Sequence, residues 1–364
     1  MEKIVQDKIL LLAKAFKSVL YSDDKEFMNN MKNSNLKGDD IERYRFWEWP
    51  QGVGLYGLWK MYKYSNDKSY LQDLCVYYDE RLIAGLPSKN INTTAPMLAM
   101  AYVYEETRNA SYLEECISWA EWIVNELPRT SERGFQHITS DSINEGELWD
   151  DTLFMTVLFL AKMGQICNND IYIEEAKYQF LLHTKYLQDK DTGLWYHGWT
   201  FMGNHNFSKA FWGRGNCWIT LAIPEFISIL PEEDSICKYL KGILVNQIEG
   251  LSKYQDISGM WHTLIDNSNS YLEASATCGF AAGILYSARL GIISNKYNTI
   301  AVNTLDSVLR LIDSDGFMHQ VSYGTPMGRI SADFYCNIPI SIMPYGQALG
   351  MLYLIEILHL LKTK

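Results

Sequence analysis

The sequence predicts an all-α protein whose helices form hairpins and close into an (α/α)6 toroid, as a single domain over residues 1–364. Two observations predict this fold. Apolar residues recur at helical spacing along nearly the whole chain, and four similar connecting segments recur at intervals of roughly 60 residues. A chain of 364 residues, 48% of them hydrophobic, can bury a sizeable core, and no linker or low-complexity segment divides it.

The helical spacing is clearest in "VQDKILLLAKAFKSVL", "YIEEAKYQFLLHTKYLQ", "SICKYLKGILVNQIEGLSKY" and "YNTIAVNTLDSVLRLI". In each stretch apolar residues return every three or four positions, which gives a helix one apolar face. The same spacing predicts the remaining helices. In chain order the predicted helices cover residues 3–20, 52–65, 68–82, 95–107, 110–126, 148–164, 170–188, 216–230, 233–252, 273–290, 294–313 and 344–361.

An internal repeat lies in the connections between these helices. Four segments contain a Gly, then apolar or aromatic residues, then a His three or four positions after the Gly, and a helix follows each segment. They are "RGFQHI" (Gly134), "TGLWYHGW" (Gly193), "SGMWHTLI" (Gly259) and "DGFMHQVS" (Gly316), separated by steps of 59, 66 and 57 residues. Six such helix pairs fill the chain, and stacked pairs can curve until the last meets the first.

In such a ring the segments that enter the inner helices line one mouth. The Gly-His segments would then form a polar, aromatic pit there. The structural alternative is that each Gly ends an outer helix and each His acts only as a local cap. We expect both descriptions to hold for some of the segments.

The composition excludes several classes of partner. The net charge of -11 argues against nucleic acid and against anionic membrane surfaces. Aromatic residues make up 13% of the chain, including 11 Trp, and most of them are expected in the core. A surplus of Trp also suits sugar binding, because the C–H face of a pyranose stacks on a flat ring.

The cysteines and the termini of the sequence indicate a cytoplasmic protein. The seven Cys are odd in number and form no CxxC, so neither a disulfide framework nor a zinc knuckle is indicated. The first twenty residues are charged throughout and lack a signal-peptide pattern. The longest uncharged run, 334–355, contains two Pro, a Gln and an Asn, so it is not predicted to span a membrane.

The stretch "GELWDDTLFMTVLFLAKMG", residues 146–164, places two acids directly before a long apolar run. An acid at a helix N-terminus is favoured by free N–H groups and by the helix dipole, so N-capping is the structural interpretation. Adjacent helical residues point about 100° apart, so Asp150 can cap or face away while Asp151 faces the ring axis. With Met155 and Trp149 nearby, an apolar pocket would raise the pKa of Asp151 and make it a proton donor.

The stretch "FWGRGNCWIT", residues 211–220, places Arg214 between two Gly, with Trp212 and Trp218 nearby. The planar fork of Arg suits a carboxylate and Trp offers a stacking face. The structural alternative is an Arg packed on Trp as a cation–π pair. Farther along the chain, Glu273 in "YLEASATCGF" is a candidate second carboxylate or a helix cap, and we expect the cap.

Metal binding is not favoured. His137, His197, His262 and His319 recur in the repeat, but no HxH or HExxH spacing supports a metal site. We therefore expect neither a metal nor a cofactor. His183, His205 and His359 follow no pattern and are assigned no role.

Taken together, "GFQH…LWDDTLFM", "TGLWYHGW" and "WGRGNCW", in this order, resemble the unsaturated rhamnogalacturonyl hydrolases of glycoside hydrolase family 105. A more distant likeness runs to the unsaturated glucuronyl hydrolases of family 88. The resemblance continues through "EASAT" and "MPYGQALG" and covers nearly the whole chain. It implies an (α/α)6 barrel that acts on small oligosaccharides left by polysaccharide lyases, such as those from rhamnogalacturonan.

The resemblance also implies a mechanism. Lyases leave a C4=C5 double bond on the non-reducing uronic acid, and these hydrolases protonate and hydrate that enol ether. The hydrated hemiketal opens and expels the neighbouring sugar, so one acid/base suffices, unlike the two-carboxylate glycosidases. By the family motif that acid is Asp151, while the substrate-binding positions match Asn92, His137, His197, Trp212, Arg214, Trp218, Met155 and Trp49.

One position departs from the family pattern. The family often has an Asp where "NINTTAPML" places Asn92. Asn can hydrogen-bond but cannot act as a base, so the single-acid mechanism stays intact while the substrate subtype is left open.

Three other functions are alternatives to an unsaturated-uronyl hydrolase. A sugar epimerase could use paired His from the repeat, and an inverting glycosidase could use Asp151 with Glu273. A non-catalytic sugar-binding homologue is a third, although the intact Asp151 and Arg214 count against it. Loss of activity in Asp151→Asn with activity retained in His262→Ala would disfavour the epimerase.

Overall fold

The structure is a computed structural model that describes residues 1–33 and 40–362, and it is mostly helical. A two-stranded antiparallel sheet, β1 with β2, accompanies the helices. In chain order the elements are α1 (Glu2–Leu20), α2 (Lys25–Asn33), η1 (Ile41–Tyr44), α3 (Trp49–Ser65), α4 (Lys68–Ala84), α5 (Ile91–Thr107), α6 (Ala110–Asn125), β1 (Glu147–Trp149), η2 (Leu153–Val157), α7 (Leu158–Cys167), α8 (Asp170–Leu187), β2 (Gly198–Thr200), α9 (Gly213–Ile229), α10 (Ser235–Lys253), α11 (Ala274–Arg289), η3 (Asn295–Tyr297), α12 (Asn298–Val302), α13 (Leu305–Leu311), η4 (Ala332–Asn337) and α14 (Pro344–Lys362).

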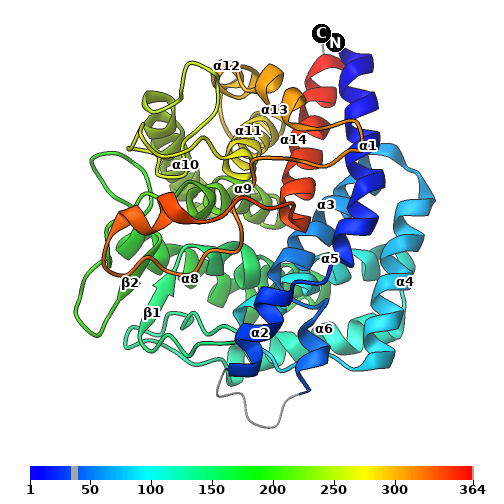
Figure 1. The fold of residues 1–364 in the computed structure, drawn as a ribbon. Coiled ribbons are helices and arrows are strands. Elements are labelled where there is room, and N and C mark those ends of the chain that lie inside the picture. The colour runs from blue at the N-terminus through cyan, green and yellow to red at the C-terminus, as the bar shows by residue number, and fades with distance from the viewer. Residues whose placement is uncertain (34–39, 363–364) are drawn as a thin grey trace.

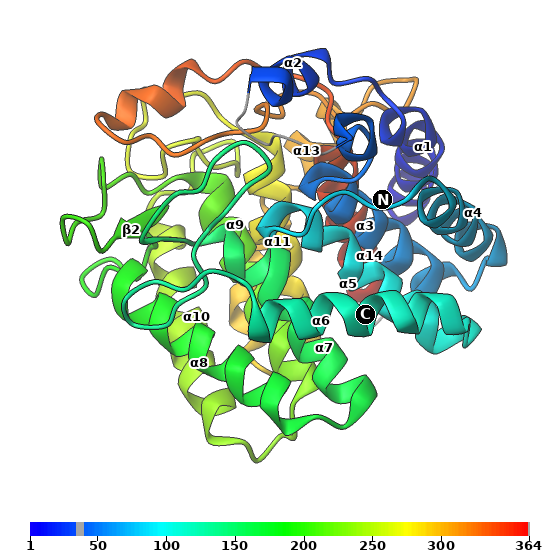
Figure 2. The same cartoon turned by 90° about the horizontal axis from the view of Figure 1, so that it is seen from below.

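The helices form two concentric rings, which confirms the predicted (α/α)6 toroid. The inner ring runs α3, α5, η2 with α7, α9, α11 and α14, and it closes because α14 contacts both α11 and α3. The outer helices α1, α4, α6, α8 and α10 pack on the inner ones, and Figure 2 shows α1 and α4 toward the edge and α11 and α14 inside. Helix α14 also packs against α1, which brings the two ends of the chain into one hairpin (Figure 1).

Burial explains why the inner helices show little amphipathic pattern. Almost every residue of α9, α11 and α14 is buried, because each inner helix is surrounded by two inner neighbours and an outer partner. A helix that is apolar on all sides belongs in the middle of a large core. One continuous apolar core accordingly extends from Val5 to Leu358.

The Gly-His segments have a common physical basis. Three of their four Gly have positive φ. A Cβ on each of these three would also overlap a backbone carbonyl of the outer helical segment in the next helix pair around the ring. Gly134 differs: its φ is not positive, and a Cβ there would meet the side chains of Leu148 and Leu182. The backbone contacts are Gly193 with Asn246, Gly259 with Asn303 and Gly316 with Leu11.

Several predicted helix boundaries were wrong. The helix predicted over 294–313 is divided into η3, α12 and α13, and Thr304 at the break bonds back to the Ala301 carbonyl through its hydroxyl. Helix α5 begins at Ile91 rather than at residue 95, because Asn90 and Thr93 form a capping box.

Other elements were not predicted at all: α2, η1, η4 and the β1–β2 sheet had no counterpart in the helical pattern. In the described ranges, 1–33 and 40–362, no helix combines the length and the apolar character needed to cross a bilayer.

Candidate active site

A pocket of about 500 Å³ opens where the inner helices begin. Residues at or beside the first turns of α3, α5, η2, α9 and α14 line it, together with α2 and the segments 323–326 and 339–343. Helix N-termini carry partial positive charge, which favours a bound anion at this end of the ring, although Glu48 and Asn90 already accept N–H groups at the starts of α3 and α5. Among the residues predicted for the site, Trp49, Asn92, His137, Asp151 and Trp212 line the pocket.

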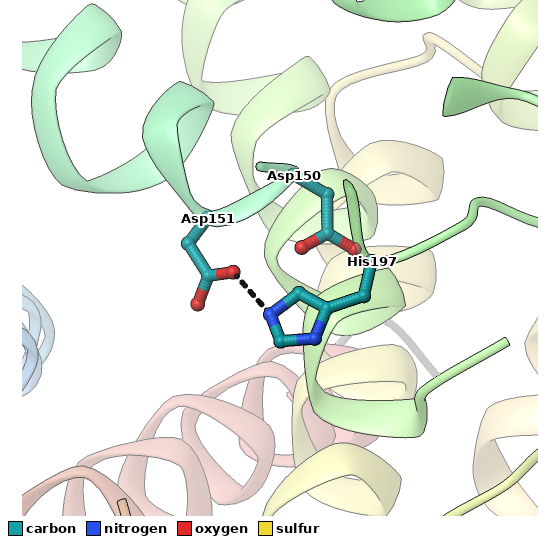
Figure 3. A group of neighbouring side chains, drawn as sticks. All are labelled: Asp150, Asp151 and His197. Carbon is teal, nitrogen blue, oxygen red and sulfur yellow. Dashed lines mark ion pairs between the residues drawn. The ribbon is translucent and has the colours of Figure 1, made fainter. Parts of the chain in front are cut away.

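Asp151 lies at the pocket surface, just before η2. Its side chain is 16% exposed, and its Oδ2 lies 3.2 Å from Nε2 of His197 (Figure 3). Burial alone raises the pKa of a carboxyl group, but the hydrogen bond and charge of His197 outweigh it and hold the pKa of Asp151 well below its usual range. Asp151 is therefore a carboxylate in the free protein.

Asp150 lies directly behind Asp151 and is fully buried. Burial, followed by the negative charge of Asp151, raises the pKa of Asp150 well above its usual range. Two adjacent carboxyl groups titrate as a pair, and within this pair the buried Asp150 is the member that favours the proton. Oxygen and nitrogen atoms of Asp150, Asp151 and His197 all come within 4.8 Å of one another.

These positions correct two expectations from the sequence. Asp150 does not face away from the site, since its carboxyl group is beside His197 (Figure 3). The pKa raised by burial belongs to Asp150 and not to Asp151. The physical reason is that Gly215 leaves room for the Asp150 carboxyl group, which a Cβ at Gly215 would overlap.

The β1–β2 sheet brings Asp151 and His197 together. Trp149 of β1 pairs with Gly198 of β2, and the Asp150 N–H donates to the His197 carbonyl at 3.0 Å. The first Gly-His segment joins the other edge of β1, where the His137 N–H donates to the Glu147 carbonyl at 3.0 Å. Residues 46 positions apart in the sequence thus form one acid–imidazole pair.

Trp149 organises the two His of the site. It stacks on His137 with ring centroids 4.3 Å apart and meets His197 edge-on at 5.2 Å. Nδ1 of His137 lies 2.7 Å from the Thr152 hydroxyl, and Nδ1 of His197 lies 2.6 Å from the Tyr335 hydroxyl. Burial lowers the pKa of His137 to about 3, so this imidazole is neutral and can only exchange hydrogen bonds.

Arg214 has a supporting position beneath the pocket. It is fully buried and does not line the cavity. Its guanidinium donates to Ser322, to the Tyr323 carbonyl at 3.0 Å and to the Thr325 hydroxyl at 2.8 Å. Its guanidinium carbon also lies 4.7 Å from the ring centroid of Trp212. Arg214 therefore holds a segment that does line the pocket, as a cation–π pair beneath Trp212.

The remaining predicted residues shape the walls. Trp49 faces the pocket and stacks on Tyr345 with centroids 4.5 Å apart, while Trp218 meets Trp49 edge-on at 6.2 Å. Trp218 and Met155 are buried behind the lining and do not reach the cavity.

Glu273 is a helix cap, as expected from the sequence. Its carboxylate accepts the Ala276 N–H at the start of α11 and also bonds Ser275 and Ser322.

The structure adds residues that the sequence analysis missed. Glu48 and Gln51, beside and within the first turn of α3, line the pocket, and Tyr335 holds His197 from η4. An acid directly before "WPQG" is a helix N-cap signal, so Glu48 could have been found from its position. Tyr335 lies in an uncharged run without periodicity and gave no such signal.

The raised pKa of Asp150 favours acid–base chemistry over metal binding at this group. In the described part of the chain, Asp150, Asp151 and His197 form the group whose spacing suits a metal ion. A carboxyl group that retains its proton is a poor ligand, because metals bind the deprotonated form. The four-His set considered above does not gather, since His262 bonds the Ser270 carbonyl and His319 bonds Asp313.

The family model of Glycosyl Hydrolase Family 88 matches residues 22–361. The chain belongs to glycosyl hydrolase family 88, and it is a glycoside hydrolase. The unsaturated rhamnogalacturonyl hydrolase YesR of Bacillus subtilis is 31% identical over 321 residues, which cover 87% of this chain and 90% of that protein.

Two solved structures illustrate the relationship within and around family 88. A possible member of glycoside hydrolase family 105 from Salmonella enterica is 43% identical, with a TM-score of 0.91, covering 99% of this chain and 95% of that one. The unsaturated glucuronyl hydrolase of Bacillus sp. GL1 is 16% identical, with a TM-score of 0.72, covering 98% of this chain and 97% of that one. The second likeness supports the fold alone.

Proposed function

We propose that this family 88 hydrolase removes the 4,5-unsaturated uronate from the non-reducing end of short, lyase-generated oligosaccharides, with rhamnogalacturonan products as the first candidates. The observation that carries the proposal is the Asp150–Asp151–His197 group at the mouth of the ring. It combines one stored proton with one carboxylate, at a site where helix N-termini favour an anionic sugar. We infer that residues 1–364 act as one catalytic domain, which the continuous core supports.

In the proposed reaction the carboxyl pair is acid first and base second. Asp151, on the pocket side, passes the shared proton to C4 while positive charge develops at C5. A water molecule then attacks C5, and its proton returns to the pair. The bond between C5 and the ring oxygen breaks to give a C5 ketone and a C1 hemiacetal, which releases the neighbouring sugar as an alcohol. His197 keeps Asp151 in position and stabilises the doubly charged pair.

The other predicted residues are proposed to bind the sugar. Trp49 and Trp212 offer ring faces at the cavity wall, and Asn92 and His137 offer hydrogen bonds. Arg214, Trp218 and Met155 act from behind the lining by fixing these groups. The inverting-glycosidase alternative loses its second acid, because the Glu273 carboxylate caps α11 and does not line the pocket.

The test is to follow the ultraviolet absorbance of the conjugated double bond during incubation with unsaturated disaccharides. Substrates from rhamnogalacturonan and from glucuronate-containing glycans should be compared, with Asp151→Asn in parallel. We expect loss of absorbance with the wild type and a rate lower by about 10²–10⁴-fold in Asp151→Asn, the usual effect of losing an acid–base group. No loss of absorbance with any of these disaccharides would refute the proposal.

A further inference from the structure

Glu48 is a buried carboxyl group in the wall of the pocket, and the mechanism above does not use it. It is only 4% exposed, yet it lines the same cavity as Asp151. It directly precedes α3, while Asn92 lies in the first turn of α5 and Asp151 begins the next inner helix. Three consecutive inner helices around the ring therefore each present a polar side chain to the pocket.

The carboxyl group of Glu48 is held by surrounding donors. The Ser140 hydroxyl donates to one oxygen and the Trp49 N–H donates to the other at 3.3 Å, which makes Glu48 the N-cap of α3. The Asn92 side chain hydrogen-bonds the same carboxyl group, and Asn90 supports Ser140 through a 3.1 Å bond. Glu48 and Asn92 therefore form one carboxyl–amide unit in the wall.

A helix cap alone does not explain why this acid is buried in a cavity. Burial raises the pKa of Glu48 to about 8, so the group is mostly uncharged at neutral pH. A neutral carboxyl group beside an amide can both donate and accept hydrogen bonds. It also avoids repulsion with the carboxylate of a uronate substrate.

The unsaturated uronate carries two hydroxyl groups, at C2 and C3, that are complementary to the carboxyl–amide unit of Glu48 and Asn92. Elimination by a lyase removes the stereocentres at C4 and C5, so galacturonate and glucuronate give the same unsaturated ring. What still distinguishes one terminal ring from another is the anomeric configuration at C1 and the C2–C3 diol. When C4 is at Asp151, the C3 hydroxyl is on the adjacent ring carbon and the C2 hydroxyl on the next one, so the diol needs polar partners elsewhere in the same pocket wall.

On the basis of the proposed function, we propose that Glu48 is a substrate-contacting residue. Its carboxyl group, with the Asn92 amide, hydrogen-bonds the C2 and C3 hydroxyls of the unsaturated uronate. This contact sets the preference of the enzyme for their configuration. A site built around hydroxyl groups rejects a ring that presents them wrongly, because its own buried polar groups are then left unpaired.

The experiment compares two synthetic substrates that carry the same aglycone and differ only in configuration at C2. One has the C2 configuration of glucuronate and the other that of mannuronate, and both are followed by double-bond absorbance. We expect the wild type to prefer the first by about 10- to 100-fold in kcat/KM, as for one lost buried hydrogen bond. Glu48→Ala should raise KM by at least tenfold, change kcat by less than threefold and reduce this preference to within threefold.

Two further variants distinguish the loss of a substrate contact from the loss of a structural helix cap. Glu48→Gln keeps a donor and an acceptor, so it should recover most of the affinity and preference that Glu48→Ala loses. Asp67→Ala removes the acidic N-cap of α4, outside the pocket, and controls for the loss of a cap. The three melting temperatures should be compared with the wild type.

The outcomes discriminate between the two proposals. An unchanged KM and an unchanged C2 preference in Glu48→Ala would overturn the role of Glu48 and leave the proposed function standing. The same would follow if Asp67→Ala changed KM as much as Glu48→Ala does. A wild type that consumes no unsaturated substrate would overturn the proposed function, and the role of Glu48 with it.

Discussion

Replacing Glu48 by Gln is expected to stabilise the protein at neutral pH. Burial gives Glu48 a folded-state pKa of about 8, against 4.5 for the exposed group. Between these values the folded state holds a proton that the unfolded state has lost, so stability falls as the pH rises from 4.5 toward 8. At pH 7 the interval is two and a half pH units, which at roughly 1.4 kcal/mol per unit is an upper bound of about 3.5 kcal/mol, so a penalty of about 3 kcal/mol is expected. Gln cannot ionise and escapes this penalty.

Urea unfolding of the wild type and Glu48→Gln at pH 5 and pH 7 measures this effect. The variant should gain less than about 1 kcal/mol at pH 5 and about 3 kcal/mol at pH 7. Equal differences at both pH values, or a less stable variant at pH 7, would refute a raised pKa for Glu48. A gain in stability would also fit a functional role, because groups kept for function often reduce stability.

Three further predictions concern the ring and the acid pair. His197→Ala removes the group that holds the pKa of Asp151 down, so the acidic limb of the kcat/KM profile should move to higher pH; an unmoved limb would contradict the pairing. Gly193→Ala should lower stability in urea by about 1–3 kcal/mol, because its φ is +77° and the new Cβ meets the Asn246 carbonyl; an unchanged midpoint would count against that contact. Dialysis against EDTA should leave kcat unchanged, since Asp150 retains its proton, whereas a loss restored by a divalent cation would show a metal site.

The ring could be predicted from the sequence because its signal is local and repeated. Each Gly-His segment needs a Gly where the chain passes the backbone of the next outer layer, and Gly193, Gly259 and Gly316 all show this contact. The helices between them follow from apolar spacing. The division of the helix at Thr304 could not be predicted in this way, because it depends on local bonds that compete with the helix.

Of the residues predicted for the site, some line the pocket and others, such as Arg214, do not, and the electrostatics of the acid pair were not predicted. The sequence indicated Asp151, but the assignment of charge within the acid pair depends on His197 and Gly215, which reach it from other segments. Contacts between segments so far apart leave no local pattern in one sequence. Arg214 is a second example. Its hydrogen-bond partners at 322–325 lie more than a hundred positions away in the sequence, and the bonds to them direct its guanidinium away from the cavity.

The closure of the ring by α14 has a consequence for how the chain folds during synthesis. Gln347 of α14 bonds the Gly316 carbonyl and, across 335 residues of sequence, the Leu12 carbonyl of α1. Until that last helix leaves the ribosome, α11 and α3 have no neighbour at the seam, and their apolar flanks stay open to water. Contacts of such long range form slowly and leave partly built chains prone to aggregation. The nascent protein therefore has a late, single closing step, and a chain cut just before Pro344 should associate with other copies rather than persist as an open ring.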